Sequence, residues 1–132
     1  MNKPLEEKQP PLVLHCGHED PLAFRELLTN IGDKWSIFIL LGLSMIPGER
    51  ARFSLLKRSM TGISEKMLAS TLRSLERDGL VTREVFPEVP PRVEYELTAM
   101  SRSLLPALQG LVDWVADNSA KVSEARELFD SR

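Results

Sequence analysis

The chain has 132 residues, 42% of them hydrophobic, which suffices for one domain with a single small core. No apolar run approaches the roughly 20 residues that cross a bilayer, and the amino terminus lacks the apolar region of a secretory signal, so we expect a soluble, cytoplasmic protein without a membrane partner. The single cysteine, Cys16, excludes an intramolecular disulfide framework, and the net charge of −2 shows no overall bias toward nucleic acid.

The first third of the chain predicts an arm followed by two helices. Residues 1–14 contain three prolines among charged residues and are expected to form a flexible arm. Asp20 before Pro21 is a helix start signal, and this helix is expected to run over residues 21–30. Its leucines are expected to face inward; they are Leu22, Leu27 and Leu28. Residues 34–45 are apolar on almost every side, which is typical of a central core helix.

The middle of the chain predicts two helices joined by a turn. Residues 53–59 form a short helix, and the turn after it contains Gly62, which can adopt a left-handed backbone conformation. Ser64 is a suitable N-cap for the second helix, up to the break at Asp78-Gly79. At helical spacing, the side of this helix that faces the core carries Leu68, Leu72 and Leu75. The opposite side is polar and basic, with Lys66, Ser70, Arg73 and Arg77.

This middle region is also the basic part of the chain. Residues 50–92 carry nine Lys or Arg against five Asp or Glu, a net charge of +4, whereas residues 1–49 and 93–132 each carry a net charge of −3. A basic surface favours contact with phosphates, because neutralising them releases condensed counterions. Charge alone is equally consistent with an ordinary mixed surface.

Two strands and a long helix complete the pattern. Residues 80–86 are rich in β-branched side chains, residues 92–97 alternate apolar and charged ones, and the proline-rich segment 87–91 joins them as a stiff exposed tip. One expectation for this hairpin is an ion pair between Arg83 and Glu94. Thr98 caps a leucine-rich helix that is kinked at Pro106 or begins there. Residues 119–132 either extend this helix or form another.

The order helix, turn, helix and β-hairpin predicts a winged helix-turn-helix, a mainly α fold with a small β wing (α+β) whose second helix enters the DNA major groove. We expect a single domain over residues 15–132. Within it, residues 50–98 would contain the DNA-reading motif and the wing. The terminal segments 15–30 and 99–132 would form dimerisation helices.

The same residues carry a resemblance to a known family. Over about residues 16–115 the chain resembles the HxlR-type winged helix-turn-helix transcription regulators of bacteria and archaea. The most specific match is the wing run of residues 87–95, Pro-Glu-Val-Pro-Pro-Arg-Val-Glu-Tyr. The other matching pieces are Cys16, Ile31-Gly32-Asp33-Lys34-Trp35, Arg52-Phe53, Leu56, Gly62-Ile63-Ser64, Met67-Leu68, Leu72-Arg73, Leu75-Glu76, Asp78-Gly79-Leu80-Val81, Arg83 and Leu97-Thr98. The chain departs from the family pattern at Gly17, where proline is common, and at Asp33, where a second glycine is more usual.

The motif and the resemblance together imply a repressor or activator that binds a pseudo-palindromic double-stranded operator as a homodimer, without a cofactor or metal. The candidates for DNA contact are Ser64, Lys66, Ser70, Arg73, Arg77, Arg92 and Arg52. Arg92 would either enter a narrow minor groove or pack on the wing and touch phosphate. The serines would bind phosphate or act as caps. The candidates for the dimer interface are Leu22, Leu108, Leu111 and Trp114.

Cys16 lies between His15 and His18, and three roles are open for it. The resemblance implies a sensor of oxidants or electrophiles, because some family members use this cysteine in that way. The alternatives are a small residue packed at the dimer interface and a metal ligand, although a zinc site would be short of ligands. A small-molecule effector would bind between the terminal helices and the reading domain. We expect no enzyme; the other possibilities are a protein-binding winged helix and a Cys–His enzyme.

Overall fold

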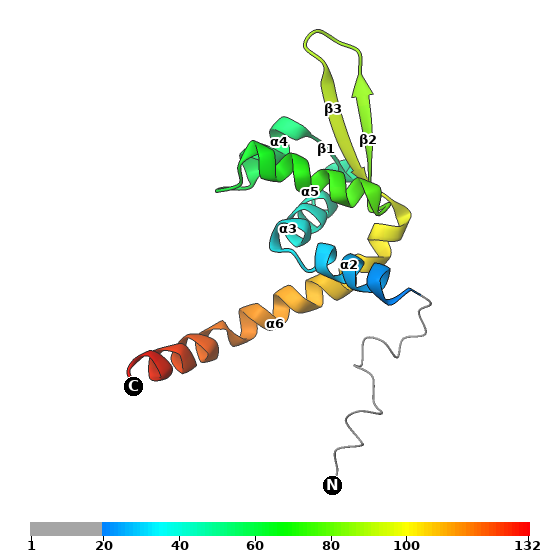
Figure 1. Ribbon diagram of the computed structural model, residues 1–132. Helices are drawn as coiled ribbons and strands as arrows, with labels where there is room; N and C mark the ends of the chain where they lie inside the picture. The colour runs from blue at the N-terminus through cyan, green and yellow to red at the C-terminus, as the bar shows by residue number, and fades with distance from the viewer. Residues whose placement is uncertain (1–19) are drawn as a thin grey trace. The chain divides into compact units, whose positions relative to one another are not determined.

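The computed structural model describes residues 20–132, and the chain divides into two compact units, residues 1–33 and 34–132. In the first unit the described element is helix α2 (Pro21–Ile31; Figure 1). The Asp20 carboxylate accepts a hydrogen bond from the Ala23 amide, so the predicted helix start is confirmed. The predicted inward face of this helix is wrong for the single chain, because α2 buries none of its residues and Leu22 is 74% exposed.

The second unit contains five helical segments, including the 3₁₀ turn η2, and three strands. In chain order they are α3 (Lys34–Ser44), η2 (Pro47–Glu49), β1 (Arg50–Arg52), α4 (Phe53–Ser59), α5 (Glu65–Arg77), β2 (Val81–Phe86), β3 (Arg92–Leu97) and α6 (Ala99–Asp130). This mainly helical architecture with a small antiparallel sheet confirms the predicted fold class.

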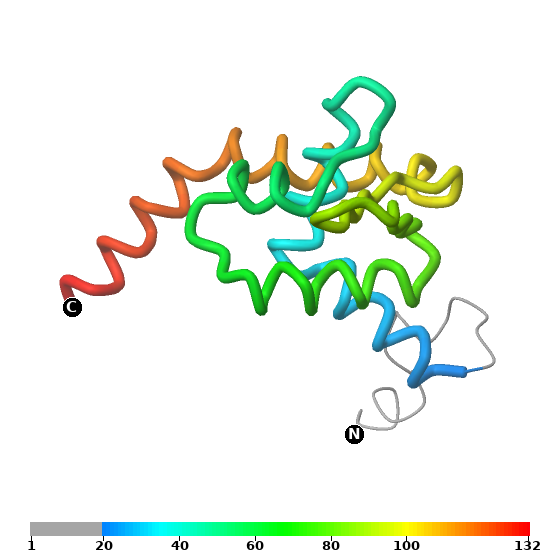
Figure 2. Tube along the Cα trace, turned by 90° about the horizontal axis from the view of Figure 1, so that it is seen from above, coloured from blue at the N-terminus to red at the C-terminus, as the bar shows by residue number. Residues whose placement is uncertain are grey.

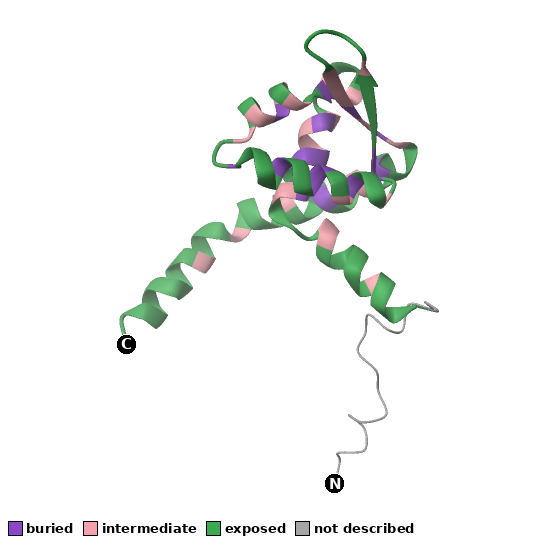
Figure 3. Cartoon of the chain, turned by 45° about the horizontal axis from the view of Figure 1, so that its top comes forward, coloured by how far each residue is buried: buried purple, intermediate pink, exposed green. Residues whose placement is uncertain are grey.

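The core of this unit lies between α3 and α5. The apolar side of α3 contributes Ile39, Leu40 and Leu43, and all three are fully buried. The predicted core stripe of α5 is confirmed, because Leu68, Leu72 and Leu75 are fully buried against this centre. Figure 3 shows the buried segments gathered where these helices meet, whereas the outer side of α5 is exposed. The burial of the leucine stripe therefore fixes which side of α5 faces solvent.

The turn between α4 and α5 has the predicted construction. Gly62 adopts a φ of 92°, which an L-amino acid with a side chain rarely adopts. The Ile63 amide donates to the Met60 carbonyl, and the Ser64 hydroxyl accepts from the Met67 amide at 3.0 Å, which caps α5. Figure 2 follows the chain from α4 through this turn and back along α5. The helix-turn-helix is thus set by a left-handed glycine and a serine cap.

The sheet has the strand order β1-β3-β2, and β1 was not predicted. In the antiparallel register Arg83 lies opposite Tyr95, and Glu84 lies opposite Glu94. Because neighbouring residues of a strand point to opposite faces, Arg83 and Glu94 lie on different faces of the sheet. The predicted Arg83–Glu94 ion pair is therefore wrong.

Helix α6 begins with a capping box in which Thr98 and Ser101 exchange hydrogen bonds, and it continues through Pro106 as a single helix to Asp130. The segment from residue 119 onward therefore extends this helix. The Thr98 hydroxyl also donates to the Gly79 carbonyl at 2.8 Å, which ties the start of α6 to the end of α5. Among residues 20–132, no helix is both long enough and apolar enough to cross a membrane.

Candidate nucleic-acid interface

The solvent-facing side of α5 carries the predicted DNA-contacting residues. Lys66, Ser70, Arg73 and Arg77 follow one another at intervals of three or four residues, so they share one face of the helix, and all four are exposed. The side chains of Lys66 and Arg73 have neither a hydrogen bond nor an ion pair with any other residue of the described chain. Their charges are therefore available to an external anion.

Small and capping residues surround these cations. Ala69 and Ser70 are exposed beside Arg73, and their short side chains leave the helix surface open to a close approach. Ser64 acts as the N-cap of α5, one of the two roles considered for it. Its hydroxyl orients the first turn of the helix, where Lys66 lies. A helix of this shape, with small residues and unpaired cations on one face, can approach the edge of a nucleic acid groove.

Arg92 is held against the wing. Its guanidinium forms ion pairs with Glu88 and with Glu94, the latter over 2.9 Å, and lies 4.0 Å from the centre of the Phe86 ring. The side chain is only partly exposed. Of the two arrangements considered for Arg92, the chain on its own adopts the one in which the side chain packs on the wing.

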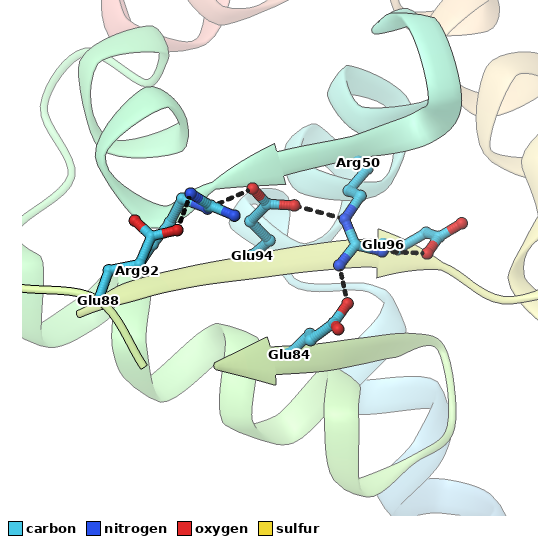
Figure 4. A network of polar contacts seen from close by, with 6 residues as sticks. All are labelled: Arg50, Glu84, Glu88, Arg92, Glu94 and Glu96. Carbon is cyan, nitrogen blue, oxygen red and sulfur yellow. Dashed lines mark hydrogen bonds and ion pairs between the residues drawn. The ribbon is translucent and has the colours of Figure 1, made fainter. Parts of the chain in front are cut away.

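Arg50 is the centre of a larger network that sequence reasoning missed (Figure 4). From the edge strand β1 its guanidinium donates to Glu94 on β3 over 2.5 Å, to Glu96 on β3 over 2.7 Å, and to Glu84 on β2. The hydrogen bond from Arg50 is the main cause of the lowered pKa of Glu94, and hydrogen bonds from Glu94 and Glu84 raise the pKa of Arg50. One arginine therefore links all three strands on one face of the sheet.

The opposite side of the wing borders α5 and forms what we call the helix–wing groove. It consists of two surface pockets that share Arg83 and Tyr95. One, of about 350 Å³, is also lined by Ala69, Arg73 and Glu76 of α5. The other, of about 430 Å³, is also lined by Arg52, Phe53, Ser54, Pro90, Pro91, Arg92 and Val93. Of the predicted DNA-contacting residues, Arg73 lines the first pocket, whereas Arg52 and Arg92 border the second from the sheet face that carries Glu94.

Other predicted residues are separate from this surface. Leu111 and Trp114 on α6 are about half exposed, whereas Leu108 is only 5% exposed and packs into the second unit. Leu22 lies in the first unit. Cys16 and the arm of residues 1–14 lie outside the described residues. Between residues 20 and 132, no three potential metal ligands gather in one place.

Comparison with known proteins matches this architecture to one family. The family model described as HxlR-like helix-turn-helix matches residues 30–123. The HTH-type transcriptional regulator YtfH of Escherichia coli is 40% identical over 103 residues, which cover 78% of this chain and 79% of that protein. A solved structure of the regulator YtfH from Salmonella typhimurium is 41% identical, with a TM-score of 0.71 over 78% of this chain and 89% of the other. The oxidised form of the redox regulator HypR is 39% identical, with a TM-score of 0.61 over 75% and 97% of the two chains. The chain therefore belongs to the HxlR-like helix-turn-helix family.

Proposed function

We propose that this protein is a transcriptional regulator that binds specific double-stranded DNA sequences as a homodimer. The observation that carries the proposal is the exposed face of α5, where Lys66 and Arg73 stand without a partner in the described part of the chain, directly after a helix-turn-helix turn. The relatives described above are transcriptional regulators, which supports a regulator over an enzyme.

The chemistry of the α5 face suits duplex DNA. Arginine forms bidentate hydrogen bonds with the O6 and N7 atoms of guanine, lysine reaches the same edge or a phosphate, and serine hydroxyls bind either. The buried leucine stripe holds this face outward, so Lys66, Ser70 and Arg73 can reach one groove together. Base contacts by these side chains would provide specificity, and contacts to phosphates would set the register on the duplex.

Exposed apolar residues support the homodimer. Leu22 of α2 is 74% exposed, and Leu111 and Trp114 of α6 are 49% and 58% exposed. Large apolar side chains exposed on helices are typical of a protein interface. A twofold dimer presents two copies of α5, which matches an operator made of two inverted half-sites. Light scattering of wild type and of Leu111→Asn plus Trp114→Gln tests this part: the wild type should have the mass of a dimer, and the variant should shift toward the monomer.

DNA binding is tested with the duplex upstream of the protein's own gene. The variant Lys66→Gln plus Arg73→Gln removes two cations per subunit. The control Arg126→Gln plus Arg132→Gln removes the same charge near the carboxyl terminus of the chain. If each α5 cation contacts one phosphate, a dimer loses four contacts and the slope of log K against log salt falls by about 3.6. The control variant should keep the wild-type slope. Binding that is absent, or independent of salt, would refute the proposal and favour a protein-interaction module.

We further propose that the regulator responds to oxidants or electrophiles through Cys16. Support comes from HypR, which is named a redox regulator and to which 75% of this chain is similar. A thiolate is the reactive form of cysteine, so oxidation of Cys16 would add a negative or covalently modified group near the start of the chain.

A small-molecule effector is the second way in which DNA binding by this protein can be regulated. The second unit has a pocket of about 570 Å³ between α3 and the helix-turn-helix turn, lined by Trp35, Phe38, Leu56, Met60 and Thr61, among others. Its size lies within the range of about 300–1,000 Å³ that is usual for ligand pockets. Because Met60 and Thr61 belong to the turn before α5, a ligand there would contact the segment that orients the reading helix.

A further inference from the structure

We infer that the helix–wing groove holds the DNA sugar–phosphate backbone, and that Arg83, rather than Arg92, is the main phosphate contact of the wing. The inference rests on the proposed DNA-binding function and assigns one side of the wing to the duplex. Sequence reasoning placed Arg83 in an ion pair within the hairpin, a pairing that the register of the sheet excludes.

The Arg83 side chain carries an unpaired charge, among the described residues, at the border between the wing and α5. It is exposed on β2, and no other residue of the described chain forms an ion pair or hydrogen bond with it. It lines the same pocket as Arg73 of the reading helix, and also the adjoining pocket lined by Arg52. Arg73 and Arg83 therefore line one pocket together, from α5 and from the wing, opposed within that lining by the single carboxylate of Glu76. Arg52 borders the adjoining pocket from the other face of the sheet, where it lies opposite Glu94.

Arg92 also lines the groove, but its charge is already neutralised. Glu88 and Glu94 pair with its guanidinium, and the Phe86 ring covers one side of it. To bind a phosphate, Arg92 would have to give up these contacts, whereas Arg83 has none to give up within the described residues. The gain from binding a phosphate is therefore larger for Arg83.

The two faces of the wing differ in charge. On the face opposite the groove, Glu84, Glu94 and Glu96 pair with Arg50, and Glu94 pairs with Arg92 as well, so the charges of these two arginines are already neutralised. Such a surface attracts phosphates less than a face with an unpaired arginine does. The duplex is therefore expected to lie on the side of Arg83 and Tyr95, which is also the side of the reading helix.

The shape of the groove suits a backbone strand. Ala69 leaves room on the α5 side, and Tyr95, only 7% exposed, forms a fixed floor between the two pockets. A DNA strand lying in this groove would contact Arg73 of α5 and Arg83 of the wing at the same time. Two cations on separate elements that contact neighbouring phosphates would fix the angle at which α5 enters the groove.

The test compares Arg83→Gln, Arg83→Lys, Arg92→Gln and the control Arg126→Gln in full-length protein, with the salt dependence of binding to the upstream duplex as the readout. A dimer of Arg83→Gln loses two phosphate contacts, so its slope of log K against log salt should fall by about 1.8. When the salt rises from 50 to 200 mM, the fold-loss of affinity should therefore be about 12 times smaller for this variant than for wild type. Arg83→Lys should keep the wild-type slope, because it keeps the charge. Arg92→Gln and Arg126→Gln should also keep it.

The outcomes separate this inference from the proposed function. If wild type and Arg83→Gln bind with the same salt slope, or if only Arg92→Gln lowers it, the assignment of Arg83 is overturned while DNA binding stands. If wild type shows no salt-dependent binding to any duplex, both are overturned. Thermal unfolding of Arg83→Gln and Arg83→Lys should match wild type, because the Arg83 side chain is exposed and unpaired within residues 20–132. A match shows that a lost slope does not arise from unfolding.

Discussion

Gly62 and Gly42 should respond in opposite ways to replacement by alanine. Gly62 has a φ of 92° in the turn before α5, and the space around it is open, since a Cβ there would meet no heavy atom within 4 Å. Gly42 is equally open but lies inside helix α3 with ordinary helical geometry. The two sites thus differ in backbone conformation and not in available space.

The expected magnitudes follow from this difference. A left-handed conformation destabilises the folded state by about 1–2 kcal/mol for an L-residue with a side chain. Alanine in place of glycine also stabilises the fold by about 0.4–1 kcal/mol, because it restricts the unfolded chain. Gly62→Ala should therefore lower the free energy of unfolding by about 0.5–1 kcal/mol. Gly42→Ala should raise it by about 0.5–1 kcal/mol, because alanine is favoured over glycine in a helix interior.

Urea unfolding followed by the fluorescence of Trp35 and Trp114 measures both values. All samples need one protein concentration, because the proposed dimerisation would make the stability depend on it. An unchanged m-value would show that the unfolded reference is comparable between variants. If Gly62→Ala were as stable as Gly42→Ala, the left-handed turn would not be part of the native structure, and the account of how α5 is positioned would fail.

Three further predictions concern the cap, the wing and the thiol. Ser64→Ala should lower the free energy of unfolding by about 1 kcal/mol through loss of the α5 cap; if it instead leaves stability unchanged in urea unfolding, the hydroxyl does not cap the helix. Arg50 lowers the pKa of Glu94 in the folded state, so this pair stabilises the fold above the ordinary value of 4.5, and the stabilisation is lost as the pH falls through the lowered folded value. Stability measured from pH 7 downward should therefore fall less in Glu94→Gln than in wild type, and parallel curves would contradict the pairing. Diamide should change the DNA affinity of wild type and not of Cys16→Ser in a gel-shift titration; equal responses of the two proteins would exclude thiol sensing.

Local signals in the sequence were sufficient for the helices of the reading motif. Ser64 followed by a leucine stripe at helical spacing predicted α5 with its core face and its polar face, because N-capping and amphipathic burial both act within a few residues. The proline-rich tip between two short strands likewise predicted the hairpin. These elements form where neighbouring residues agree on one conformation.

Long-range pairing could not be predicted in the same way. The strand β1 has three residues and no pattern of its own, and it exists because it pairs with β3 more than 40 positions further along the chain. Arg50 therefore appeared as one of many surface cations, and its carboxylate partners became visible only with the fold. The face on which Arg83 lies depends on the register of β2 against β3. A register that differed by one residue would place every side chain of the strand on the other face.

The central claim is that two reading helices of one dimer bind successive turns of duplex DNA. Selection of binding sites from a pool of random duplexes by the full-length protein tests it most directly. The account predicts enrichment of inverted repeats whose half-site centres lie about 10–10.5 base pairs apart, or a multiple of that spacing, with loss of enrichment in Lys66→Gln plus Arg73→Gln. A pool without any enriched sequence, or the same repeats selected equally well by that variant, would contradict it.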